Sequence, residues 1–160
     1  MSNKTAIRQI SESLAAFRYK FLRCRFLVNL IEASLLTIGF KGTTALLEFL
    51  NSFSKKHTYL HAGDDGDMVI IDRYYNIFYL ISLGGRFKGR CLSRSLAMQY
   101  ALKCYGLRTD LRIGVDIHNG NFFAHAWLER NGIILNDHPI NIENYFVLPL
   151  DKLNSKMQFV

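Results

Sequence analysis

The chain has 160 residues, 49 % of them hydrophobic and 21 % charged, with a net charge of +7 at pH 7 and three cysteines. This length suits one core rather than two, and the hydrophobic content excludes a disordered chain. The odd number of cysteines and the polar start of the sequence favour the reducing cytoplasm over secretion.

Residues 1–56 are predicted to form a basic helical segment. They hold nine Lys or Arg and three Glu, a net charge of +6, whereas residues 57–160 carry a net charge of only +1. Helix is expected over residues 5–53, with a break near residues 41–42. The most apolar run, residues 26–40, is interrupted by polar residues and is too short to span a membrane, so it indicates an amphipathic helix packed on the core.

The basic N-terminal segment has several candidate partners. Its charge would attract an acidic peptide, a partner protein or a membrane surface. Nucleic acid is the rival for a chain with an isoelectric point near 9.5. The sequence has no helix-turn-helix, zinc-finger or RNA-binding signature, so nucleic acid is not expected. We favour a solvated helix face as the simplest reading of this charge.

Residues 54–66 form a predicted polar loop, and the run after it fits two structures. Asp65 and Asp67 are suited to cap a helix over Met68–Leu83. The β-branched residues 69–71 instead favour a strand. Local propensity alone leaves both structures open.

Cys91 opens a predicted helix that runs to Gly106. Leu92, Leu96 and Gln99 follow helical spacing, and a glycine at 106 is typical of the position just after a helix. In the first turn of a helix, free backbone N–H groups and the helix dipole favour a thiolate, the reactive form of cysteine. Four basic residues add positive charge nearby: Arg86, Lys88, Arg90 and Arg94.

Three short strands are predicted next, over residues 111–117, 122–129 and 133–137. His125 lies in the second strand and Asp137 in the third. The turn between these strands decides whether the two side chains meet.

A three-residue loop over residues 130–132, with Gly132 left-handed, would place His125 opposite Asp137 on one face of the sheet. A two-residue turn over residues 131–132 would send the two side chains to opposite faces. We predict the three-residue loop, because it brings an imidazole to a carboxylate.

Cys91, His125 and Asp137 are therefore the candidate catalytic residues. A thiol, an imidazole that takes its proton and a carboxylate that orients the imidazole form a papain- or transglutaminase-type site. Each residue alone is more often structural than catalytic, and the combination in this order favours catalysis. Cys24 and Cys104 are expected to be structural. No cysteine pair has metal-ligand spacing, so neither a metal site nor a cofactor is predicted.

Four segments around these residues form a distinctive pattern: residues 90–97, 111–115, 123–129 and 136–137. They resemble the lasso-peptide B-protein family, transglutaminase-like cysteine peptidases that remove the leader peptide from a ribosomally made lasso precursor. The resemblance covers residues 18 to 137. It includes residues 25–33, which are similar to a Glu-Ala-containing helix before the peptidase core of that family.

The resemblance implies an α+β, papain/transglutaminase-like fold in which N-terminal helices pack on a short antiparallel sheet. The expected organisation is one compact unit, with residues 1–56 packed on a peptidase core of residues 57–160. The resemblance also favours helix over strand for residues 68–83.

The same resemblance implies a cytoplasmic peptidase with Cys91 as nucleophile, His125 as general base and Asp137 as the orienting carboxylate. The implied partners are the precursor peptide, an asparagine-synthetase-like cyclase and a separate precursor-recognition protein, because no complete fused recognition domain is seen. An acyl transferase on the same triad and a catalytically idle peptide-binding module are the alternatives.

Overall fold

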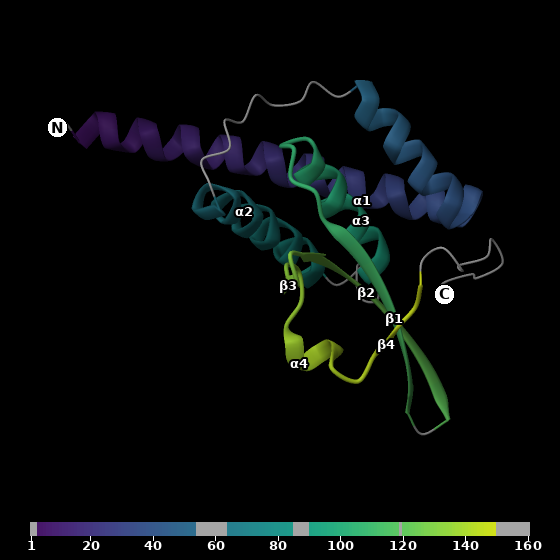
Figure 1. The fold of residues 1–160 in the computed structure, drawn as a ribbon. Coiled ribbons are helices and arrows are strands. Elements are labelled where there is room, and N and C mark those ends of the chain that lie inside the picture. Colours follow the sequence, from purple (N-terminus) through teal and green to yellow (C-terminus); the bar gives the residue numbers. More distant parts are fainter. Residues whose placement is uncertain (1–2, 54–63, 85–89, 119, 150–160) are drawn as a thin grey trace.

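The computed structural model describes residues 3–53, 64–84, 90–118 and 120–149, with side chains from residue 12 onward. Within these ranges the fold is α+β, with helices packed beside a curled four-stranded antiparallel sheet of order β3-β2-β1-β4 (Figure 1). In chain order the elements are α1 (Asn3–Phe53), α2 (Asp64–Leu83), α3 (Cys91–Lys103), β1 (Asp110–His118), β2 (Asn121–Arg130), β3 (Ile133–Ile134), α4 (Pro139–Ile142) and β4 (Phe146–Val147).

Helix α1 is long and has one kink, at Gly39, whose φ is 70° and ψ is −176°. The break predicted near residues 41–42 is therefore wrong by two or three residues. Glycine tolerates this left-handed φ because it has no Cβ. The buried Thr43 hydroxyl donates to the Gly39 carbonyl at 2.8 Å and lies 3.0 Å from the Ser34 hydroxyl, so polar groups at the kink are paired.

Helix α2 confirms the helical interpretation of residues 68–83. Its buried residues recur at helical spacing and include Ile70, Ile77 and Ile81. Burial of this apolar stripe outweighs the strand propensity of the β-branched residues. The predicted polar loop ends earlier than expected, because residues 64–66 are already helical; residues 54–63 lie outside the described residues.

Helix α3 is central and contacts α1, α2, β1 and β2. Leu96, Ala97, Met98 and Leu102 are at most 1 % exposed, so the helix is buried along most of its length beyond the first turn. Burial on this scale makes α3 a rigid element, and Cys91 is its first residue.

The turn between β2 and β3 differs from the prediction. Arg130 pairs with Ile133 across a two-residue turn, and both turn residues have positive φ, 51° at Asn131 and 78° at Gly132. Two left-handed residues define a type I′ turn, for which Asn-Gly is the preferred sequence. The predicted three-residue loop is wrong because this local turn chemistry decides the register.

A two-residue turn is expected to send His125 and Asp137 to opposite faces of the sheet. This does not happen, because β3 is too short to include Asp137. The predicted third strand, 133–137, is only Ile133–Ile134, and its pairing ends where the Leu135 amide donates to the Leu128 carbonyl at 2.9 Å. Asp137 lies beyond the strand and is free of its up-down alternation. It therefore reaches His125 despite the two-residue turn.

The β2–β3 turn provides a test of this register. Gly132→Val should destabilise the protein by about 1–2 kcal/mol, because a β-branched residue is strained at positive φ. The matched change Asn131→Gly should be neutral or stabilising, because it relieves the strain at the neighbouring residue. Urea unfolding of the two variants measures both effects. Equal stability of the Gly132→Val variant and the parent would contradict the type I′ turn.

Candidate active site

Cys91 lies at the junction of α1 and α3. Its side chain is partly buried against the hydrophobic core, and Arg90 just before it is the N-cap of α3 but makes no side-chain cap bond. The Arg90 Nε atom instead lies 3.4 Å from an oxygen of Glu32 on α1. Helix α1 thus holds the residue that precedes the candidate nucleophile.

His125 on β2 is held by Asp137. The His125 Nε2 and Asp137 Oδ2 atoms are 2.5 Å apart. The other carboxylate oxygen accepts from the His138 amide at 2.8 Å and from the Asn141 side-chain amide at 2.9 Å. Because both of its oxygens accept hydrogen bonds, the carboxylate is fixed in orientation. The imidazole uses Nε2 for Asp137, which leaves Nδ1 available to another partner.

That partner is Cys91, whose thiol hydrogen-bonds with His125. The structure therefore brings Cys91, His125 and Asp137 into one chain of hydrogen bonds. Their catalytic role stays a prediction at this point, because proximity by itself also occurs in structural ion pairs.

Electrostatics favour the charged forms of this chain. Burial would raise the pKa of Cys91, but His125 and the backbone of Ala126 and Leu92 outweigh it and lower that pKa below its usual value. Hydrogen bonds with Asp137 and Cys91 raise the pKa of His125 to about 9. Burial opposes ionisation of Asp137, yet hydrogen bonds, chiefly from His125, lower its pKa to about 2. Both shifts, downward at the thiol and upward at the imidazole, favour a thiolate–imidazolium pair over the neutral thiol and imidazole.

Two aromatic rings flank His125. Its ring centroid lies 6.1 Å from that of Trp127 and 5.6 Å from that of Tyr145. Gly114, the cross-strand partner of His125, makes this possible: a Cβ there would lie 2.7 Å from the Tyr145 Cβ and 2.9 Å from the Trp127 ring. A glycine within a strand pattern is the sequence signal for such a close approach.

A buried polar network joins the segments that carry the three residues. The Ser95 hydroxyl, one turn after Cys91, donates to the Ala126 carbonyl at 3.0 Å and accepts from the Asn136 side-chain amide at 2.8 Å. The Asn136 side-chain oxygen in turn accepts from the Leu128 amide at 2.7 Å. Ser95 and Asn136 lie in the segments that resemble the B-protein family, but no local pattern assigned them this role.

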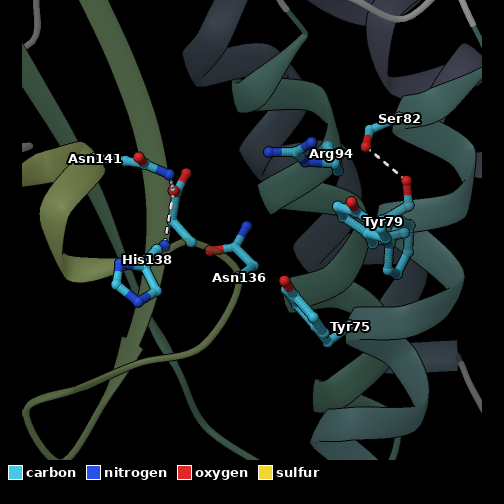
Figure 2. A pocket seen from close by; sticks show the side chains of 9 residues that line it. Tyr75, Tyr79, Ser82, Arg94, Asn136, His138 and Asn141 are labelled. Carbon is cyan, nitrogen blue, oxygen red and sulfur yellow. Dashed lines mark hydrogen bonds between the residues drawn. The ribbon is translucent and has the colours of Figure 1, made fainter.

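A cavity of about 260 Å³ borders the acidic end of the site. Figure 2 shows Arg94, Tyr75 and Tyr79 on one side of it and Asn136, His138 and Asn141 on the other. Asp137 lines the cavity, whereas Cys91 and His125 do not. The cavity therefore adjoins the orienting carboxylate and not the thiol.

Cys24 and His138 lack this setting. All three cysteines are free, and burial raises the pKa of Cys24 to about 11. His138 caps α4, accepting from the Ile140 amide at 3.4 Å. Arg86, Lys88, His57 and His61 lie outside the described residues. Among the residues that the structure describes, no cluster of His, Cys, Asp or Glu could hold a metal ion, and no helix is long and apolar enough to cross a membrane.

Comparison with known families identifies the superfamily of this chain. The transglutaminase-like superfamily profile matches residues 55–149, more than half of the chain, and this match includes Cys91, His125 and Asp137. The chain belongs to the transglutaminase-like superfamily. That superfamily includes cysteine peptidases and acyltransferases, both of which use a cysteine nucleophile. Searches of curated proteins and of solved structures returned no significant match.

The pH dependence of thiol alkylation tests the ion pair. Cys91 should react with iodoacetamide below the pH at which an ordinary thiol ionises, because the thiolate is the nucleophile and His125 lowers its pKa. The His125→Gln variant lacks the imidazole that lowers the pKa of Cys91, while burial still raises that pKa. Alkylation of Cys91 should therefore begin at a higher pH in this variant. Mass spectrometry of each cysteine gives the rates, and Cys24 is the internal control. An unchanged profile in His125→Gln would show that His125 does not hold the thiolate.

Gly114→Ala tests the aromatic support of His125. The added methyl group forces Tyr145 or Trp127 to move, at a cost of about 1–3 kcal/mol. We expect slower alkylation of Cys91 together with a lower thermal midpoint. Gly120→Ala is the control for lost stability without a clash: the positive φ of Gly120, 76°, strains an alanine, but its Cβ would meet nothing within 4 Å. If both variants lose stability but keep the parent alkylation rate, the aromatic contacts do not position His125.

Proposed function

We propose that this protein is a cysteine peptidase that removes the leader peptide from a lasso-peptide precursor. The observation that carries the proposal is the hydrogen-bonded chain from Cys91 through His125 to Asp137 at the start of a buried helix. The resemblance of the segments around these residues to the lasso-peptide B-protein family supports the choice of substrate.

The proposed reaction starts from the thiolate–imidazolium pair. The Cys91 sulfur attacks the carbonyl carbon of the last leader residue, and the His125 imidazolium gives its proton to the leaving amine of the first core residue. That amine becomes the new N-terminus of the core peptide. His125, now neutral, takes a proton from water, which attacks the thioester and releases the leader with a free carboxylate. Asp137 keeps the imidazole oriented in both steps.

The start of α3 would stabilise the tetrahedral intermediate. The first backbone N–H groups of a helix have no partner within it, and the dipole places partial positive charge there. Cys91 is the first residue of α3, and no side chain caps this end. The Cys91 amide is thus the candidate donor to the oxyanion.

Acyl transfer is the second candidate, because the superfamily also includes acyltransferases. The steps up to the thioester are identical, and only the group that resolves the thioester differs. Product mass separates the two reactions: water yields a leader with a free carboxylate, and an amine yields a leader joined to that amine.

Partners and setting follow from the proposed role. We propose that the protein works in the cytoplasm without a cofactor, on a precursor presented by a separate recognition protein, and that an asparagine-synthetase-like cyclase uses the cleaved core. Helix α1 offers a docking face for the recognition protein. Four apolar residues that are 43 % to 69 % exposed lie opposite the buried side of α1: Tyr19, Leu22, Phe26 and Leu30.

The charge around this face indicates the chemistry of its partner. Arg18, Arg23 and Arg25 are all exposed and flank the apolar residues, and the Arg23 guanidinium lies 5.5 Å from the Tyr19 ring centroid. An apolar groove with an acidic rim would complement both features.

Substitution of the cysteines tests the peptidase directly. Cys91→Ala should abolish precursor cleavage, because it removes the nucleophile, and Cys24→Ala and Cys104→Ala should change stability only. Cleavage is followed by mass spectrometry, which also identifies the acceptor of the acyl group. Full activity in the Cys91→Ala variant would exclude the proposed mechanism.

The docking face predicts a second result. A labelled leader should bind weakly to this chain alone and much more strongly when the recognition protein is added. The double variant Phe26→Ser/Leu30→Ser should lose this gain, whereas Phe49→Ser, an equally accessible residue after the kink, should keep it. Tight binding to the isolated chain would contradict a separate recognition protein. Binding of α1 to anionic vesicles, lost in the double variant, would assign this face to a membrane.

A further inference from the structure

One edge of β2 is open next to Cys91. Strand β2 pairs with β1 along its whole length, from Asp110 opposite Glu129 to His118 opposite Asn121. On its other side, β3 pairs only with Glu129 and Arg130. Within the described residues, no strand covers the rest of this edge (Figure 1).

Three hydrogen bonds of β2 identify which backbone groups point to the open edge. The N–H and C=O groups of Leu128 both point away from β1, since they bond to Asn136 and Leu135. The Ala126 carbonyl points the same way and accepts from Ser95. In an antiparallel strand every second residue faces the same side, so the N–H and C=O groups of Ala124 and Phe122 also face the open edge.

Cys91 lies at the end of this open stretch. Its thiol hydrogen-bonds with the backbone of Ala126, which is the next residue along the same edge. The stretch from Phe122 to Ala126 is about 13 Å long at about 3.3 Å per residue, which is room for about four residues of an extended peptide.

The side chains along the edge suit an extended peptide and do not protect the edge. Ala124 and Phe122 alternate with Phe123 on the other face, and Phe122 is 63 % and Phe123 is 47 % exposed. Natural proteins usually shield an exposed edge with charged residues or proline, and residues 121–124 contain neither. Apolar side chains on both faces would contact the alternating side chains of an added strand.

We propose that the open edge of β2 at Ala124 and Phe122 binds the substrate as an added strand, in the segment next to its scissile bond. The occupant is an extended polypeptide, because the edge ends at the reacting sulfur and offers alternating backbone donors and acceptors. This inference rests on the proposed peptidase function, and it adds the mode of binding and the length of peptide recognised.

The test compares two electrophilic probes that alkylate Cys91 with loss of chloride: a single-residue chloromethyl ketone and its four-residue peptidyl homologue. The longer probe should react faster with the parent protein. Ala124→Pro should reduce that advantage by roughly fivefold, the effect of about one hydrogen bond, because proline removes an edge N–H that β1 does not use. Ala124→Val keeps the N–H group and should keep the advantage. Iodoacetamide, which cannot use the edge, should alkylate Cys91 equally in all three proteins.

N-methylation of the four-residue probe repeats the test on the unchanged protein. Loss of rate at alternate residues only would support strand addition. Equal rates for all N-methylated probes, or an undiminished length advantage in Ala124→Pro, would overturn it. These results are separate from the leader-peptidase proposal: a length advantage in a protein that leaves the precursor intact supports the edge and rejects that function. A dimer that dissociates in Ala124→Pro, with no length advantage in the parent, would assign the edge to a second copy.

Discussion

The 2.5 Å contact between His125 and Asp137 is the constraint on which the site depends. It fixes which imidazole nitrogen faces Cys91 and holds the proton on the ring, and this stabilises the thiolate in turn. Burial works against the charge on each of the three groups. A buried charge without its partner is costly, so loss of any one group should destabilise the charged forms of the other two.

The fold supplies the supports that keep this contact short. The Ser95–Asn136 network ties α3, β2 and the segment after β3 together within a few residues of Cys91, His125 and Asp137. Each of its members is buried, and an unsatisfied buried partner costs about 1–3 kcal/mol. Gly114 lets two aromatic rings approach His125, and Glu32 of α1 holds Arg90. Helix α1, the strands β1 and β2 and the segment after β3 therefore all support the site at the start of α3.

Local features of the sequence predict the helices and strands, but they do not predict which side chains of those elements come into contact. Helical spacing predicted α3 and the position of Cys91 at its start, and the α+β class was predicted correctly. The three-residue loop predicted over residues 130–132 is wrong, because it rests on the expected contact between His125 and Asp137 and not on the preference of Asn131-Gly132 for a two-residue turn. Turn chemistry is local and decided the register, while the contact depends on where β3 ends. The Ser95–Asn136 bonds and the packing of Tyr145 against Trp127 depend on residues far apart in the chain, which one-dimensional spacing does not encode.

The central claim is that Asp137 holds a proton on His125 and thereby keeps Cys91 ionised. Nuclear magnetic resonance titration of the imidazole measures this most directly, with the His125 signal assigned by its loss in His125→Gln. We expect a pKa of about 9 for His125 in the parent protein and a value shifted toward the usual range near 6.5 in Asp137→Asn. An ordinary pKa for His125 in the parent, unchanged in Asp137→Asn, would contradict it.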